Sequence, residues 1–354
     1  MLKSLIKNIL PYGLIVGLRN RRTTKHTIVF NLHSKELLCQ SKSHYKEILS
    51  IQGFGYSGHT ALVNLFQEYK SVQECTQTAA AGESSYEIDF MRLGGGVLDF
   101  ERYLDSANIF QNDAAFHRLL KQMSGCVIFR EQELCKQLAD MYLSNLLDME
   151  LKDLSAVYYN GALADRENPD TSIYYIKNMT VSEFRQLTRD FFTAFFNVFH
   201  QESKKVLMLD HFFTDYEWDM PKYNDYVPGI KVVALYRDPR DVYYYANLKN
   251  VEWIPHNNVQ DFIKWCGKTY GKFNIESTEY LPLRFEDLVL DYDNTVAKLE
   301  DYVGLDPKDH VDKFKFLNPE KSKNNIGIWR QAPELKEDMD KILKEMPHLC
   351  YIQK

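Results

Sequence analysis

Residues 46–68 constrain the fold most, because an apolar run there passes through a glycine-rich turn into apolar residues at helical spacing. This order predicts a β-strand, an anion-binding loop and an α-helix. Glycines in such a turn adopt backbone angles closed to other residues, so consecutive N–H groups can converge on a phosphate at the positive end of the helix dipole. Residues 53–60 follow the phosphate-loop pattern G-x-x-x-x-G-H-T, with His59 where a nucleoside triphosphatase has lysine. The missing lysine disfavours an ATP-hydrolysing enzyme and leaves the anion-binding loop in place.

A second strand is predicted at residues 232–236, where an apolar run leads into the sequence R-D-P-R-D at 237–241. Asp238 suits the cap of a following helix, and Pro239 suits its first turn. Arg237 is therefore expected at the carboxyl end of a strand, which is where open α/β sheets bind their ligands.

Taken in order, these segments resemble the PAPS-dependent P-loop sulfotransferase family, where PAPS is 3′-phosphoadenosine 5′-phosphosulfate. A third segment, S-K-N-N-I-G-I-W at 322–329, looks like the family's late R-K-G-x-x-G-x-W segment, with matches at Lys323, Gly327 and Trp329. The resemblance covers residues 46–330 and implies a three-layer α/β fold with a central, mostly parallel sheet flanked by helices. It also implies PAPS as the sulfuryl donor and PAP as its product.

The resemblance further implies that the first loop holds the 5′-phosphosulfate and that the second and third segments hold the 3′-phosphate. Two positions depart from the family pattern: Tyr56 replaces a lysine or arginine, and Tyr245 replaces a serine on the 3′-phosphate. A phenol titrates near ~10, so either neighbouring donors replace the missing loop cation or a cation comes from elsewhere. The residues expected to bind the cofactor are Gly55, Tyr56, Ser57, Gly58, His59, Thr60, Arg237, Tyr245, Lys323 and Asn324.

The general base is expected to be His211, with Glu87 as the second candidate. His211 comes shortly after an apolar run at 206–209, and cytosolic sulfotransferases carry a histidine that acts as general base at a similar place. Glu87 comes where glycan-modifying members carry a glutamate that deprotonates the acceptor. His59 is expected to stabilise the leaving phosphate. Two alternatives stay open, a histidine that only forms hydrogen bonds at a strand end and a glutamate on a solvated face.

Composition limits the class of protein. The net charge of −6 disfavours a nonspecific nucleic-acid binder. The six cysteines are scattered without metal-ligand spacing, which favours a reducing cytoplasm, and no metal site is expected. Without a linker rich in proline, glycine or serine, residues 46–354 are expected to form one α/β domain with a helical insertion around 112–180.

Residues 1–45 form a separate amphipathic and basic segment in this scheme. Leucine and isoleucine share one face of a predicted helix before Pro11, and four basic residues follow at 19–25. Two interpretations stay open: a helix packed on the domain, or one that lies on the inner membrane surface through residues 1–25.

The sequence thus predicts a sulfotransferase that transfers a sulfuryl group from PAPS to an acceptor hydroxyl. The acceptor is expected to be a carbohydrate or lipid-linked glycan, or a sterol or other lipid alcohol, because the many aromatic residues suit both. A P-loop kinase and a noncatalytic protein that binds PAPS remain as alternatives. The kinase would need a lysine in place of His59 and an aspartate that binds Mg²⁺.

Overall fold

The computed structural model describes residues 28–29, 43–77, 86–87, 90–105, 112–126, 128–151, 173–212 and 220–352. The expected membrane contact through residues 1–25 lies outside these ranges, as does nearly all of the expected N-terminal segment 1–45. Across the described ranges, no helix is both long enough and apolar enough to cross a membrane.

A five-stranded parallel sheet forms the centre of the fold, in the order β10-β9-β2-β8-β3. Alternate residues of β9 enter different cores, with Val232 and Ala234 on one face and Val233 and Leu235 on the other. This period of two is typical of a strand buried on both faces. The strands are β2 (Glu47–Gly53), β3 (Val72–Glu74), β8 (Val206–Asp210), β9 (Lys231–Tyr236) and β10 (Leu281–Arg284).

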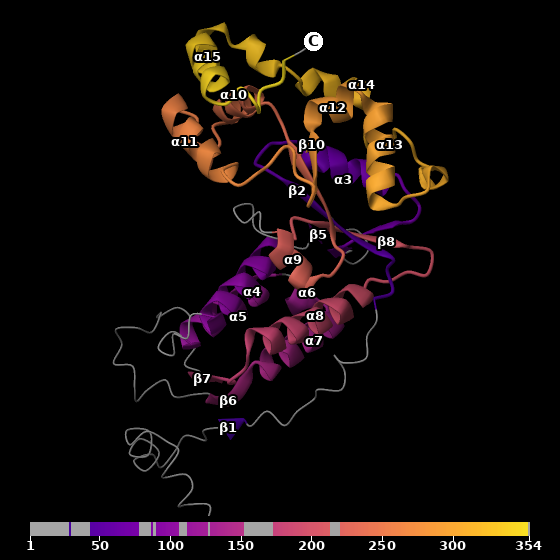
Figure 1. Cartoon of the computed structure of the whole chain (residues 1–354), viewed down its shortest axis with the longest axis vertical. Coiled ribbons are helices and arrows are strands. Elements are labelled where there is room, and N and C mark those ends of the chain that lie inside the picture. Colours follow the sequence, from indigo (N-terminus) through magenta and orange to yellow (C-terminus); the bar gives the residue numbers. More distant parts are fainter. Residues whose placement is uncertain are drawn as a thin grey trace, which may run out of the picture.

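Helices cover both faces of this sheet (Figure 1). One face packs against α3 (His59–Gln67), α12 (Phe285–Leu290) and α13 (Tyr292–Val303). The predicted α/β class, with a parallel central sheet between helices, is therefore confirmed. The helices of the other face are α4 (Phe90–Asp105), α5 (Asn112–Gly125), α6 (Ile128–Glu131), α7 (Glu133–Asn145), α8 (Val181–Asn197) and α9 (Met220–Tyr226).

A third core lies beside β9, where the C-terminal part of the chain packs. Its helices are α10 (Pro239–Lys249), α11 (Val259–Thr269) and α15 (Lys336–Glu345). The short elements of this part are α14 (Pro319–Ser322) and the 3₁₀ turns Pro307–Asp309, Lys323–Asn325, Ile328–Gln331 and Pro333–Leu335.

Two small antiparallel sheets lie outside the central one. Within the expected insertion around 112–180, the helices α5 to α7 are followed by β6 (Leu147–Leu151) and β7 (Ile173–Ile176), and β6 also pairs with β1 (Ile28–Val29). The other small sheet joins β4 (Thr76–Gln77) to β5 (Tyr86–Glu87). The domain boundaries themselves stay predictions.

The order of the central strands fixes where a ligand can bind. β2 lies between β8 and β9, and all three run in the same direction. Their carboxyl ends therefore meet at one edge of the sheet, which is the usual ligand position in open α/β folds. The chain leaves these strands at Gly53, Asp210 and Tyr236.

Candidate functional site

The predicted glycine-rich turn from strand to helix is present between β2 and α3. Gly58 precedes α3 with a φ of 88°, in the left-handed region, and no side chain caps the helix there. A Cβ atom on Gly58 would lie 2.7 Å from the ring of Phe285, and one on Gly53 would lie 2.6 Å from Cβ of His59. Both positions thus require glycine for space, and the first-turn N–H groups of α3 have no capping side chain.

Two polar atoms at this loop are buried without a hydrogen-bond partner in the part of the chain that the structure describes. They are Oγ of Ser57 and Nε of Arg237. A buried donor left unpaired costs roughly 1–3 kcal/mol, so a native site of this kind usually pairs it with a ligand or water. The pair fits an anionic ligand with oxygens near the loop.

Arg237 links the loop to the late segment, and it lies at the carboxyl end of β9 as predicted. Its Nη1 donates to the carbonyl of Tyr56 at 3.3 Å, and its Nη2 donates to the carbonyl of Asn325. Its Nη2 also lies 3.6 Å from Oδ2 of Asp241, and the guanidinium carbon lies 5.2 Å from the Phe285 ring centroid. Only 6% of Arg237 is exposed, so its position is tightly fixed.

Asp241 is the last residue of the R-D-P-R-D motif, and the motif alone gives it no role. Its two carboxylate oxygens accept from the backbone N–H groups of Gly327 (2.8 Å) and Trp329 (3.1 Å). Burial raises the pKa of Asp241, while Arg237 opposes that rise. Asp241 therefore anchors the late segment to α10, close to Arg237.

Arg240, the second arginine of the R-D-P-R-D motif, makes contacts that stabilise the fold. Arg240 donates through Nη2 to Oδ2 of Asp238 at 2.6 Å and to the carbonyl of Tyr351 at 2.9 Å. Its guanidinium carbon also lies 4.4 Å from the ring centroid of Trp329. Because Asp238 neutralises it, Arg240 adds little positive charge to the site. Asp238 also caps α10, as predicted.

Glu286 lies directly behind this motif, fully buried at the start of α12. Its Oε1 accepts from the backbone N–H of Asp238 at 3.0 Å, and its Oε2 is buried without a partner among the described residues. Burial raises the pKa of Glu286 from 4.5 to about 7. The sequence motif F-E-D-L-V at 285–289 contained this residue, but its burial depends on packing that spacing does not reveal.

A raised carboxyl pKa makes folding favour the protonated form. The contribution of protonated Glu286 to the free energy of unfolding is fully present below pH 4.5, which is the pKa of this group in the unfolded chain. It is lost as the pH rises through about 7, the pKa in the folded protein. This shift corresponds to about 3 kcal/mol. We therefore expect Glu286→Gln to flatten the loss of unfolding free energy between pH 5 and pH 8, measured by urea titration. The control Glu320→Gln changes an exposed glutamate and should keep the wild-type dependence, whereas equal slopes for all three proteins would contradict the assignment.

Lys323 and Asn324, both expected at the 3′-phosphate, are exposed. Nζ of Lys323 pairs with Oε1 of Glu320 at 2.6 Å. Their connection to the loop runs through the neighbouring Asn325, whose carbonyl accepts from Arg237. Lys323 also lines a cavity of about 480 Å³ beside α12 and α13. The phosphate contacts of both residues stay predictions.

Three aromatic rings lie over the loop. Tyr56 has a φ of 58°, which is unusual for a residue with a Cβ atom, and its ring centroid lies 4.7 Å from that of Tyr245. The Trp253 ring stacks on Tyr56 at 5.7 Å and is 59% exposed. The structure thus brings the two departures from the family pattern together and adds Trp253, which no motif indicated.

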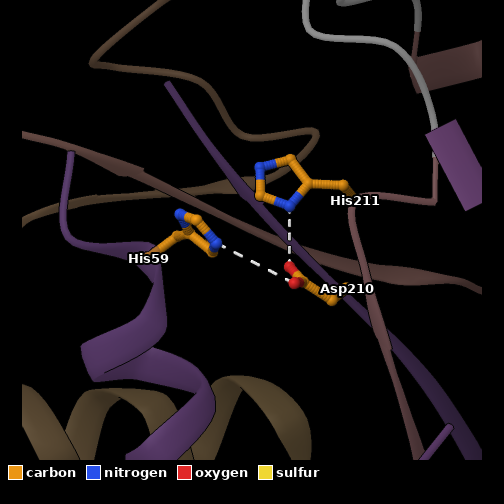
Figure 2. A group of neighbouring side chains, drawn as sticks. All are labelled: His59, Asp210 and His211. Carbon is orange, nitrogen blue, oxygen red and sulfur yellow. Dashed lines mark hydrogen bonds and ion pairs between the residues drawn. The ribbon is translucent and has the colours of Figure 1, made fainter. Parts of the chain in front are cut away.

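A cluster of three side chains lies where the loop ends, with His59 at the start of α3 and Asp210 at the end of β8 next to His211 (Figure 2). Nδ1 of His211 lies 2.7 Å from Oδ1 of Asp210, and Nε2 of His211 lies 3.1 Å from the Gly53 carbonyl oxygen. Nε2 of His59 lies 3.8 Å from Oδ2 of Asp210. The structure therefore brings two of the three predicted catalytic residues together, with a carboxylate that the sequence interpretation missed.

His59 is uncharged at neutral pH. Burial and, to a smaller extent, the neighbouring His211 lower the pKa of His59 from 6.5 to about 4, while Asp210 opposes both effects. His59 can therefore offer an N–H group to an anion, but it does not replace the charge of the missing lysine. Thr60 is exposed in the first turn of α3. For Glu87, the structure describes the backbone in β5 and not the side chain, so its role as a base stays a prediction.

Comparisons with known proteins add only a faint likeness. No protein-family model and no curated protein sequence matches this chain. The sulfotransferase domain of the Synechococcus PCC 7002 olefin synthase is 11% identical over 89% of this chain and 99% of its own, with a TM-score of 0.39. Sulfotransferase STF1 from Mycobacterium tuberculosis is 13% identical over 80% of this chain and 77% of its own, with a TM-score of 0.34.

Sulfotransferase STF9 from Mycobacterium avium is 6% identical over 84% of this chain and 76% of its own, with a TM-score of 0.32. All three TM-scores are below 0.5, so these likenesses do not decide the function.

Proposed function

We propose that this chain binds PAPS and transfers its sulfuryl group to an acceptor hydroxyl. The observation that carries the proposal is the contact between Arg237 and the loop, where Nη1 donates to the carbonyl of Tyr56 at 3.3 Å. One guanidinium and one anion loop thereby meet at the same edge of the sheet. A nucleotide with phosphates at both its 3′ and 5′ positions needs two such anion sites close together.

The residues present fit such a donor. The loop N–H groups and Oγ of Ser57 are suited to the 5′-phosphosulfate, and Nε of Arg237 is suited to the 3′-phosphate, since neither side-chain atom has a hydrogen-bond partner among the described residues. The donor supplies an activated sulfuryl group and leaves as PAP. Alignment and fixed hydrogen-bond donors would then provide most of the acceleration.

We propose that His211, which lies beside the loop at the end of β8, removes the proton from the acceptor hydroxyl. An imidazole has the right basicity to accept a proton from an alcohol as it attacks sulfur, which contributes about 10²–10⁴ in rate. Glu87 remains the second candidate. His59 is proposed to donate a hydrogen bond to the leaving phosphate as a neutral group.

One observation keeps a noncatalytic PAPS-binding protein in consideration. Both ring nitrogens of His211 already contact acceptors within the chain, Asp210 and Gly53, so the base must release one contact to act. A protein of this kind would hold PAP without turnover. The kinase alternative is less favoured, since the neutral His59 does not supply the phosphate-binding charge of a P-loop lysine.

The aromatic surface beside the loop is compatible with two acceptor classes. Tyr56, Tyr245 and the exposed Trp253 offer flat apolar faces that stack equally well on sugar rings and on a sterol. We propose a carbohydrate or lipid-linked glycan, or a sterol or lipid alcohol, as the acceptor. The test is transfer of label from radiolabelled PAPS to panels of both kinds. Label in neither panel, with PAP affinity retained, would favour the noncatalytic protein.

We also propose that residues 1–25 contact an anionic membrane surface. The basic residues Arg19, Arg21, Arg22 and Lys25 follow an amphipathic pattern, which is the composition of interfacial helices. Deleting residues 1–22 is expected to release the protein from anionic vesicles in a flotation assay. Neutral vesicles serve as the control, and unchanged partitioning of the deletion variant would contradict the proposal.

A further inference from the structure

The cluster of His59, Asp210 and His211 has two physical explanations. Its three ligand-type atoms lie within 4.8 Å of one another, a spacing that a transition metal ion could bridge. On a tetrahedral zinc, two ligand atoms lie about 3.3 Å apart, since each is about 2.0–2.1 Å from the metal. The 2.7 Å separation of Nδ1 of His211 and Oδ1 of Asp210 is shorter than this and is normal for a hydrogen bond to a charged group. The geometry therefore favours a hydrogen-bonded pair.

The surroundings of His211 hold its ring in one place. Its backbone N–H donates to the carbonyl of Ile51 at 2.9 Å, and its φ is 46°, a conformation that costs energy for a residue with a Cβ atom. That conformation turns the chain at the end of β8, and the ring lies between Asp210 and the Gly53 carbonyl. Strained residues of this kind occur preferentially at functional sites.

The two contacts have opposite consequences for the neutral ring. A carboxylate only accepts, so Asp210 favours the tautomer with hydrogen on Nδ1 and leaves the lone pair on Nε2. The Gly53 carbonyl also only accepts, so it is poorly matched to that lone pair and well matched to a protonated Nε2. Both acceptors are satisfied together only when the ring carries two protons.

We propose that Asp210 is a positioning residue for the base: it fixes the tautomer of His211 and, with the Gly53 carbonyl, stabilises the imidazolium formed when Nε2 takes up a proton. This inference rests on the proposed sulfuryl transfer. In that reaction the acceptor's hydroxyl proton moves to Nε2, and the acceptor oxygen bonds to sulfur. The bond from sulfur to the 5′-phosphate oxygen breaks, PAP leaves with that electron pair, and the ring later releases its proton to water.

The Gly53 carbonyl also connects the base to the anion loop, because Gly53 is the first glycine of that loop. A displacement of the loop would change the partner of Nε2. Asp210 thus sets which nitrogen is basic, and Gly53 provides the acceptor for the proton once it is bound.

The test is Asp210→Asn. An amide can donate to Nδ1, which favours the opposite tautomer with hydrogen on Nε2, bonded to the Gly53 carbonyl. We expect kcat to fall by about 100-fold or more, within the range of general-base catalysis, while PAP affinity changes less than about twofold. Asp210→Glu restores a carboxylate and should recover part of the rate. Asp293→Asn, at an exposed aspartate paired with Lys313, is the control.

A spectroscopic measurement tests the same contact without turnover. In protein with ¹⁵N-labelled histidine, the wild-type His211 ring should carry hydrogen on Nδ1, and Asp210→Asn should move it to Nε2 alone. Identical ring signals in the two folded proteins would overturn the proposal. A wild-type kcat in the variant, or turnover abolished by a metal chelator, would do so as well. If the wild type does not bind PAP, the proposed function is refuted, while the ¹⁵N measurement of the His211 ring remains a valid test of the contact with Asp210.

Discussion

We expect Arg237→Ala to weaken PAP binding by about 100-fold, because charge-assisted hydrogen bonds to a phosphate contribute about 3 kcal/mol here. AMP, which lacks the 3′-phosphate, should lose much less. The structural reason is Nε of Arg237, which is buried where the loop and the late segment meet and has no partner in the described part of the chain. Calorimetric titration of both proteins with both nucleotides measures the difference.

The comparison with AMP is needed because Arg237 also supports the loop. Its Nη1 holds the Tyr56 carbonyl, so the substitution could loosen the 5′ site as well. Equal losses for PAP and AMP would show that Arg237 acts through the loop and would count against a 3′-phosphate contact. Arg330→Ala is the matched control: this exposed arginine stacks on Trp329 and should leave both affinities near wild type.

We expect His211→Ala to lower turnover by about 10²–10⁴ while PAP affinity stays within about twofold. The side chain faces Asp210, the Gly53 carbonyl and the ring of His59. Single-turnover transfer from labelled PAPS, together with PAP titration, separates the two quantities. His348→Ala, at an exposed histidine near the C-terminus, is the control. An active His211→Ala would move the base to Glu87.

The sequence predicted those parts of the fold that depend on neighbouring residues. The strand, loop and helix around Gly58 follow from glycine chemistry and apolar spacing within about twenty residues. The position of Arg237 at the end of β9 follows equally from its own segment, because Asp238 and Pro239 mark the start of α10. Local signals of this kind need no knowledge of the sheet order.

The contacts that complete the site join segments far apart in the chain. Asp210 and His59 are separated by about 150 residues and meet only because β8 pairs with β2. The bond from Asp241 to the late segment and the burial of Glu286 likewise depend on how α10 and α12 pack. Spacing in the sequence contains no information on these distances. The family resemblance also predicts that Lys323 binds the 3′-phosphate. In the structure Lys323 pairs with Glu320, so the phosphate contact stays a prediction.

Calorimetric titration of the purified full chain with PAP, then with ADP, and then with ATP and Mg²⁺ tests the proposed PAPS site. We expect PAP to bind tighter than ADP, because only PAP has a 3′-phosphate for Arg237. We also expect no gain from Mg²⁺, since the proposed site uses N–H groups, a hydroxyl and a guanidinium. Preference for ATP with Mg²⁺, or no binding of any of the three nucleotides, would contradict the assignment of a sulfotransferase.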